Sequence, residues 1–185
     1  SILSSQGYNS IGIHSYHNWF YRRNEVYKNF GFNKFISSEF FIDPLYKYEY
    51  IADQEITNMI IEEVEKSKEP VFIHAVTMQN HGPYYAWKNG EQNKIRVEGE
   101  LSSEAKDILE TYAQGLMDAD LSLKALVDHF DKSKEPTVIA FFGDHLPMLG
   151  EDYMVYRETG FYKNDASYSE YRNMYSVPVV VWSNY

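Results

Sequence analysis

Residues 137–145 of this 185-residue chain read Thr137-Val138-Ile139-Ala140-Phe141-Phe142-Gly143-Asp144-His145. The mostly apolar run 137–142 is typical of a buried strand in a parallel sheet. Ligands of open α/β sheets bind where strands end, and a carboxylate beside an imidazole suits a divalent metal such as Zn²⁺ or Mn²⁺. The stretch therefore predicts a buried parallel strand followed by two metal ligands. The alternative is a loop whose Asp caps the next helix.

The segments around this stretch alternate between helical and strand patterns. The ranges expected as helices are 18–29, 53–67 (with Asp53 as the cap) and 102–130. The ranges expected as strands are 8–14, 70–76, 137–142 and 177–182, and the ranges 37–50 and 85–101 are expected as loops. Helices that alternate with buried strands predict an α/β fold with a largely parallel sheet and helices on both faces.

The bulk composition narrows the functional class. The net charge is −10, from 27 acidic and 17 basic residues, so no nucleic-acid partner is expected and the surface charge does not favour an anionic membrane. The chain has no cysteine, which excludes disulfides and thiolate zinc sites. No apolar run is long enough to span a membrane, and the length suits a single domain, residues 1–185.

Three histidines, His14, His81 and His145, each follow an expected strand. In a parallel sheet they would lie at one edge. His81, in Asn-His-Gly-Pro at 80–83, is interpreted either as a hydrogen-bond donor or proton shuttle for an anionic oxygen, or as an incidental residue of a polar turn. Arg23 is interpreted either as a bidentate phosphate or sulfate ligand or as part of a solvated helix face.

Taken together, these segments resemble the lipoteichoic acid synthase family, a branch of the sulfatase and alkaline phosphatase superfamily. The matching pieces are His14 with Arg23, then 27–35, 77–84, 142–147 and 177–184, in that order. Asn-His-Gly-Pro together with Gly-Asp-His is fairly specific to this branch. The resemblance implies a sulfatase-like α/β fold that is incomplete at its N-terminal side, with residues 1–185 as the C-terminal portion of a catalytic domain.

The resemblance also implies roles for individual residues. Asp144 and His145 would be metal ligands, and His81 would be catalytic. The residues expected to bind the substrate are His14, Tyr21, Arg23 and His81. Tyr21 stands where the family often has Trp. The implied cofactor is one divalent ion, usually Mn²⁺.

The implied activity is that of a metal-dependent phosphoglycerol transferase acting on phosphatidylglycerol, a lipid-linked glycerol phosphate. The implied location is the extracellular face of a bacterial cell membrane, with anchoring by N-terminal helices outside this chain. Nothing before His14 matches the family's nucleophilic Thr or its further acidic metal ligand. The chain by itself is therefore expected to be inactive, to hold metal weakly or not at all, and to self-associate through an exposed strand edge.

Alternatives remain open at this point. A sulfatase or a phosphoethanolamine transferase on the same fold would use similar Arg and His residues. A non-catalytic homologue that binds an anionic polymer would also keep them. A flavodoxin-like cofactor binder would fit the α/β pattern alone. The main expectation is that His14, Arg23, His81, Asp144 and His145 meet in one pocket for a cation and an oxyanion.

Overall fold

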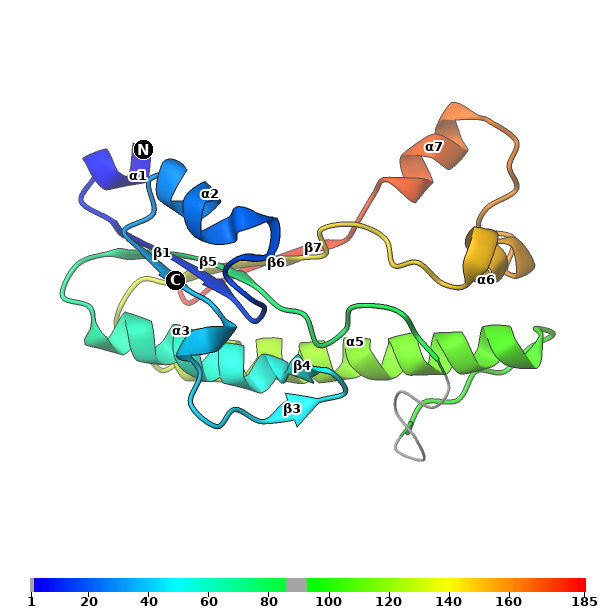
Figure 1. Ribbon diagram of the computed structural model, residues 1–185, viewed down its shortest axis with the longest axis horizontal. Coiled ribbons are helices and arrows are strands. Elements are labelled where there is room, and N and C mark those ends of the chain that lie inside the picture. The colour runs from blue at the N-terminus through cyan, green and yellow to red at the C-terminus, as the bar shows by residue number, and fades with distance from the viewer. Residues whose placement is uncertain (1, 86–92) are drawn as a thin grey trace. The chain divides into compact units, whose positions relative to one another are not determined.

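The computed structural model of the protein describes residues 2–85 and 93–185 (Figure 1). The chain divides into two compact units, Ser1–Gln79 and Asn80–Tyr185. The expectation of a single domain stays a prediction. Within the described residues, none of the helices combines the length and the apolar character needed to cross a membrane.

The first unit contains a small parallel sheet. Its elements are α1 (Ile2–Ser5), β1 (Asn9–His14), the 3-10 helix η1 (Phe20–Arg22), α2 (Arg23–Asn29), β2 (Lys34–Ile36), the 3-10 helix η2 (Ser38–Phe40), β3 (Tyr46–Lys47), β4 (Tyr50–Ile51), α3 (Asp53–Lys66) and β5 (Val71–Val76). The strand order is β2-β1-β5, and both pairings are parallel. The predicted α/β class with a parallel sheet is therefore confirmed. The range 37–50, expected as a loop, contains η2, all of β3 and the first residue of β4, and β3 and β4 pair antiparallel.

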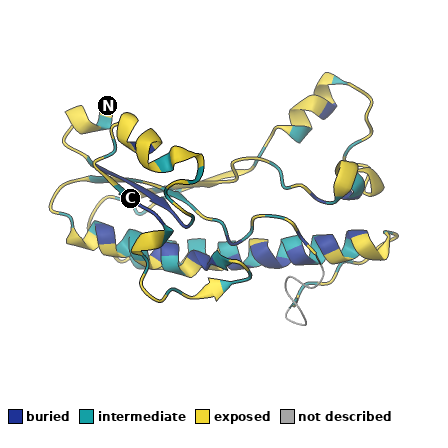
Figure 2. Ribbon diagram, in the orientation of Figure 1, coloured by how far each residue is buried: buried dark blue, intermediate teal, exposed yellow. Residues whose placement is uncertain are grey.

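The central strand β1 is covered on both faces, because α2 and α3 lie on opposite sides of the sheet (Figure 1). On the α3 side, an apolar cluster joins the sheet to the helix, and its buried members are Ile11, Ile13, Ile36 and Ile56. Figure 2 shows β1 as a buried strand. All of β1 after its first residue is buried, including the polar residues Ser10 and His14, and the strand expected at 8–14 is confirmed with its start one residue later.

On the α2 side, Tyr27 packs directly over Gly12. The Tyr27 ring stacks on Phe35, with ring centroids 4.3 Å apart, and its hydroxyl lies 3.3 Å from His74 Nδ1. A Cβ at Gly12 would overlap the Tyr27 ring. Gly12 therefore lets α2 approach the sheet closely.

Helix α2 ends as the sequence predicts but begins later. At its end, the N–H of Phe32 donates to the carbonyl of Tyr27, and Gly31 has a φ of +83°, which is the glycine-terminated geometry common at helix ends. The expected helix 18–29 is wrong in its first half, because Tyr21 and Arg22 both have a φ of 53°. This left-handed backbone cannot continue a right-handed helix.

The start of α3 also differs by one residue from the expectation. Ala52 occupies the cap position without a side-chain hydrogen bond, so the prediction that Asp53 caps this helix is wrong. Asp53 is instead the buried first residue of the helix, and its backbone N–H donates to Gln79 Oε1 over 2.8 Å. A side chain from after β5 thus satisfies one of the helix's otherwise unpaired N–H groups.

The second unit is built on one long helix. Its elements are α5 (Ser103–Phe130), β6 (Val138–Phe142), the 3-10 helix η4 (Glu151–Tyr153), α6 (Met154–Glu158), α7 (Tyr168–Met174) and β7 (Val179–Ser183). Ser102 caps α5 by accepting a hydrogen bond from the N–H of Ala105, which confirms the predicted start. In the expected loop 85–101, residues 86–92 lie outside the described part of the chain.

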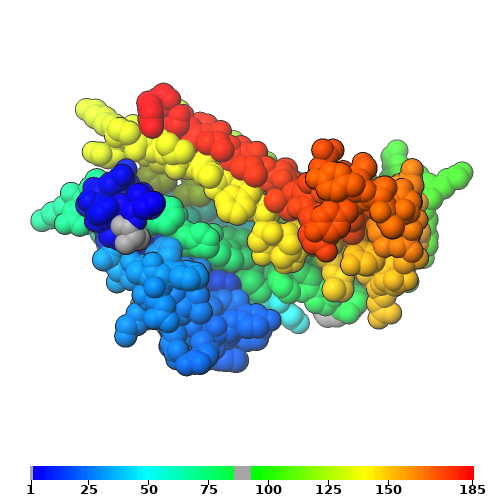
Figure 3. All heavy atoms as spheres, turned by 90° about the horizontal axis from the view of Figure 1, so that it is seen from above, coloured from blue at the N-terminus to red at the C-terminus, as the bar shows by residue number. Residues whose placement is uncertain are grey.

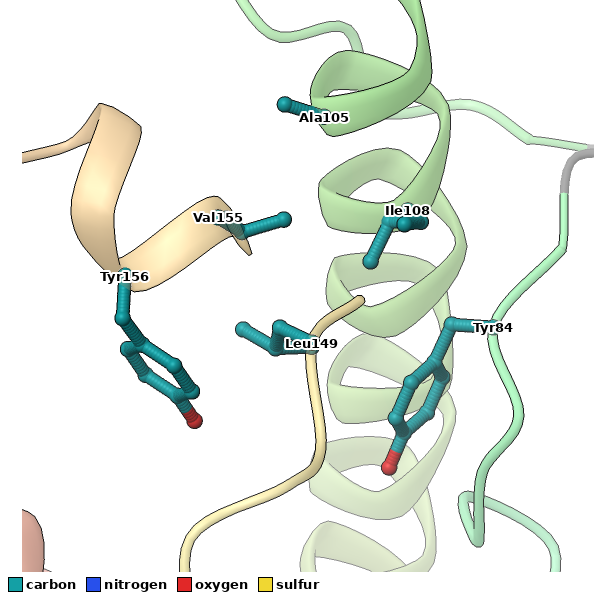
Figure 4. Close-up of a cluster of buried hydrophobic side chains, with 6 residues drawn as sticks. All are labelled: Tyr84, Ala105, Ile108, Leu149, Val155 and Tyr156. Atoms are coloured by element: carbon teal, nitrogen blue, oxygen red, sulfur yellow. The ribbon is translucent and has the colours of Figure 1, made fainter. Parts of the chain in front are cut away.

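The core of the second unit lies where α6 and a preceding loop pack on α5. Its buried residues, shown in Figure 4, are Tyr84, Ala105, Ile108, Leu149, Val155 and Tyr156. Within α5, Ala105, Ile108 and Phe130 are buried, whereas Leu116 is exposed.

Strand β6 departs from the expectation for residues 137–142. It pairs antiparallel with β7 in a two-stranded sheet, and Figure 3 shows the two running side by side. Most of its residues are exposed, as Figure 2 shows. The prediction of a buried parallel strand is therefore wrong for these described residues, because an apolar run reports the capacity for burial and not the presence of covering layers.

The packing of Tyr27 over Gly12 yields a stability test. The change Gly12→Ala forces the Tyr27 ring to move, and we expect it to lower the free energy of unfolding by roughly 1–3 kcal/mol, as in other overpacked cores. Urea unfolding followed by circular dichroism measures it. Gly143→Ala is the matched control, because the nearest atom to its new Cβ is 3.8 Å away. A Gly12→Ala protein as stable as the control would contradict the proposed role.

Candidate functional site

The first candidate residues lie at the carboxyl end of β1. His14 is the last residue of this strand and is only 4% exposed. Its Nδ1 atom is buried and has no hydrogen-bond partner within the described chain. Burial, followed by the nearby charges of Arg23 and His74, lowers the pKa of His14 to about 4. His14 is therefore neutral at neutral pH, and its Nδ1 can form one hydrogen bond with a ligand without adding a charge to the site.

Arg23 supplies the positive charge near His14. Its guanidinium lies over the rings of Phe20, Tyr21 and Tyr16, with its central carbon 5.1, 5.7 and 5.9 Å from the ring centroids. One of its nitrogens, Nη1, is buried without a hydrogen-bond partner in residues 2–85 and 93–185. A buried cationic donor with an unused N–H is costly unless an anion binds it. The end of β1 can therefore accept an oxyanion.

The segment that carries Arg23 is conformationally strained. Tyr21 and Arg22 adopt the left-handed conformation, which disfavours residues with a Cβ. Such strain concentrates at functional sites, where the surrounding structure holds it. Here it turns the chain from η1 into α2, so that Arg23 begins the helix. Tyr21 itself is 79% exposed and contacts Arg23 through its ring, and its substrate-binding role stays a prediction.

In the second unit, His81 sits in a loop that is tied to α5. The Tyr84 hydroxyl donates to the Asn80 carbonyl over 2.7 Å, and the Asn80 side-chain amide donates to the Tyr112 carbonyl over 3.5 Å. The His81 Nδ1 lies 2.8 Å from the carbonyl of Gly82. Because a carbonyl can only accept, Nδ1 carries the proton and Nε2 carries the lone pair. This tautomer suits a general base.

Two residues place this loop: Asn80, from the Asn-His-Gly-Pro motif, and Gly115, which the sequence pattern did not identify. A Cβ at Gly115, in the middle of α5, would overlap the side-chain amide of Asn80. Glycine inside a helix costs about 1 kcal/mol of stability relative to alanine. A glycine within an otherwise strong helix therefore indicates that another part of the chain packs closely there. Asn80 and Gly115 together hold the backbone beside His81 against the helix.

Asp144 and His145 follow β6, where the sequence placed them. The His145 Nε2 atom lies 3.5 Å from Asp144 Oδ2, and the side chains are 69% and 78% exposed. The His145 Nδ1 lies 2.8 Å from the Leu146 carbonyl, so Nδ1 donates and Nε2 carries the lone pair. A metal-binding histidine usually has its other nitrogen anchored in this way.

The fit of a metal to these residues is partial. One carboxylate and one imidazole are suitable ligands for Mn²⁺, but stable sites use more than two protein ligands. In the two described ranges there is no cluster of three or more His, Asp or Glu side chains that could hold an ion. The metal-ligand roles, and the expectation that the five site residues share one pocket, stay predictions.

The low pKa of His14 predicts a pH dependence of stability. Its folded-state pKa of about 4 lies below the ordinary 6.5, so the unfolded chain binds more protons between these values. Stability is therefore full above about pH 6.5 and falls as the pH drops toward 4, by up to about 3 kcal/mol. Urea unfolding between pH 7 and pH 4 should show a smaller loss for His14→Gln than for the wild type.

Equal pH slopes for the wild type and His14→Gln would contradict the burial of a neutral His14.

Comparison with known proteins gives the family context. The sulfatase family model matches residues 1–185. A Rhizobium meliloti (strain 1021) protein named for cyclic beta-1,2-glucan modification is 39% identical over 189 residues, which cover 100% of this chain and 29% of that protein. The lipoteichoic acid synthase of Staphylococcus saprophyticus is 28% identical over 144 residues, or 76% of this chain and 21% of that protein.

A solved structure agrees with these relatives. The Streptococcus pyogenes phosphoglycerol transferase GacH, in complex with sn-glycerol-1-phosphate, matches with a TM-score of 0.72 and 27% identity, over 97% of this chain and 44% of that one. The chain thus spans less than a third of these curated relatives and less than half of that structure. The predicted resemblance to lipoteichoic acid synthases is confirmed, and the chain belongs to the sulfatase family.

Proposed function

We propose that the protein is a metal-dependent phosphoglycerol transferase. The observation that carries the proposal is a pair of buried nitrogens at the end of β1, His14 Nδ1 and Arg23 Nη1, which have no hydrogen-bond partner among residues 2–85 and 93–185. A phosphoryl group offers negatively charged oxygens that match such donors. The 27% identity to a phosphoglycerol transferase supports glycerol phosphate as the group transferred, in preference to a sulfate ester or phosphoethanolamine.

Each residue of this chain has a distinct part in the proposal. Arg23 binds a non-bridging phosphoryl oxygen and balances its charge, since its charge persists at every physiological pH. His14 stays neutral and donates one hydrogen bond, which fixes orientation. His81, protonated at Nδ1, accepts or returns a proton through Nε2 at the reacting hydroxyl. Tyr21 packs beside the bound group.

The metal and the nucleophile complete the proposal. Asp144 and His145 would hold one divalent ion, proposed to be Mn²⁺, which lowers the pKa of a bound hydroxyl and offsets phosphoryl charge. A threonine nucleophile and a further acidic ligand are proposed to come from the full-length protein outside these 185 residues. The donor is proposed to be phosphatidylglycerol at the extracellular face of a bacterial membrane, reached through anchoring helices also outside this chain.

The acceptor is proposed to be a glycan. The relative named for cyclic beta-1,2-glucan modification is 39% identical over the whole chain, whereas the lipoteichoic acid synthase is 28% identical over a shorter stretch. A sugar hydroxyl is chemically equivalent to the glycerol hydroxyl at the end of a growing polyglycerol phosphate. The same transfer chemistry can therefore serve either acceptor.

The proposal predicts the effect of removing His81. In the full-length protein, His81→Ala should lower the release of glycerol phosphate from a phosphatidylglycerol analogue about 10²–10⁴-fold, the usual contribution of a general acid–base group. His129→Ala, on the last turn of α5, is the matched control and should leave the rate unchanged. Turnover measured with Mn²⁺ and then with a chelator tests the metal requirement, because a metal-dependent enzyme loses its activity in the chelator. The 185-residue chain by itself should be inactive.

Several outcomes would overturn this proposal. Unchanged turnover in His81→Ala would remove His81 from the reaction. Faster hydrolysis of an aryl sulfate than of the phosphatidylglycerol analogue would favour a sulfatase. Binding of an anionic polymer with no turnover in the full-length protein would favour the non-catalytic alternative.

A further inference from the structure

The segment between β1 and α2 exposes an aromatic ring that the proposed chemistry does not use. Trp19 is 63% exposed, although it is one of the largest apolar side chains of the chain. One face of its ring system stacks on His17, with centroids 5.3 Å apart and planes 12° from parallel. The Trp19 and Phe20 rings form a T-shaped pair, with 6.1 Å between their centroids. Because 63% of Trp19 is exposed, much of its ring surface remains open to solvent.

Hydrogen bonds from polar groups hold His17, on the covered side of the Trp19 ring, in place. The Nδ1 of His17 lies 3.3 Å from Glu39 Oε1 and 3.3 Å from the hydroxyl of Ser38. The backbone N–H of Asn18 also donates to Glu39 Oε1, over 3.3 Å. Glu39 therefore holds the His17 imidazole, which stacks on Trp19, and the backbone of Asn18, which precedes Trp19. The position of the Trp19 ring is thus stabilised before any ligand binds.

We propose that Trp19 is a stacking platform for a neutral hexopyranose ring of the glycan acceptor. This inference rests on the proposed function and names the substrate class of that site. A sugar ring has one face of C–H bonds with partial positive charge, and an aromatic face is electrostatically negative. The sugar's hydroxyls project from its rim and can hydrogen-bond to water or to polar groups around the aromatic ring.

The position of the platform along the chain supports this assignment. Trp19 lies only four residues before Arg23, and Phe20 contacts both Trp19 and the Arg23 guanidinium. Phe20 therefore links the platform to the residue that is proposed to bind the phosphoryl oxygen, within one short segment of the chain. An acceptor hydroxyl needs this proximity to attack.

A membrane-inserting role for the same aromatic ring is less consistent with its surroundings. The platform stands beside Glu39 and beside the exposed ion pair of Arg22 with Glu25. The chain as a whole carries a net charge of −10, which opposes approach to an anionic bilayer. The amphipathic surroundings of the ring fit a carbohydrate, which also presents an apolar face and a polar rim.

The test measures glycan binding by calorimetry, with the full-length protein and a neutral β-1,2-linked glucan oligosaccharide, in the absence of donor lipid. We expect Trp19→Ala to weaken binding about tenfold, the effect of losing one aromatic stacking contact together with its buried area. Trp19→Phe keeps an aromatic face and should retain most of the affinity. Phe30→Ala is the matched control, because Phe30 is 70% exposed in the same unit, and it should bind like the wild type.

The outcomes separate this inference from the proposed function. Absence of glycan binding by the wild type, or equal affinity of Trp19→Ala and wild type, would overturn the platform even if glycerol phosphate is transferred. Trp19-dependent glycan binding by a protein without transferase activity would support the platform and overturn the function. Trp19-dependent binding to phosphatidylglycerol vesicles, without glycan binding, would replace the platform by a membrane contact.

Discussion

The burial of β1 on both faces is the constraint on which the first unit depends. A central parallel strand must be covered on each side, and here α3 covers one face with an apolar cluster while α2 covers the other through Tyr27. The two faces impose different demands on alternate residues. Ile11 and Ile13 fill the α3 side. On the α2 side, Gly12 has no side chain, which leaves space for the Tyr27 ring. His14 is the next residue on the α2 side, and the same packing buries it.

That environment explains the electrostatics of the candidate site. Desolvation keeps His14 neutral, and the strained turn at Tyr21 and Arg22 brings a cation to the same end of the strand. The charge of Arg23 attracts an anionic ligand from a distance. The neutral His14 acts only at hydrogen-bond distance, so it selects ligands by their geometry. The unpartnered nitrogens leave part of the hydrogen-bonding capacity of this region for a ligand.

Much of this architecture could be predicted from the sequence, because it depends on local patterns. The strand 9–14, the long helix with its Ser102 cap, and the glycine end of α2 all carry their signals in consecutive residues. The exposure of β6 could not be predicted, because an apolar run does not say which layers cover it. The left-handed Tyr21 and Arg22 gave no signal either, since neither is a glycine or asparagine.

The candidate site was predictable to a similar degree. Motif positions and strand ends identified His14, His81, Asp144 and His145, but not the state of each group. The neutrality of His14 follows from burial by side chains distant in sequence. The contact of Asn80 with Gly115 joins residues 35 positions apart, and only the glycine hinted at it.

The most direct test of the account is a crystal structure of the full-length protein with sn-glycerol-1-phosphate bound. We expect a phosphate oxygen within about 3.2 Å of Arg23 Nη1, a usual hydrogen-bond distance, and a hydrogen bond from His14 to the same ligand. Phosphate bound elsewhere, with both nitrogens paired to protein groups instead, would contradict the claim that the end of β1 is an oxyanion site.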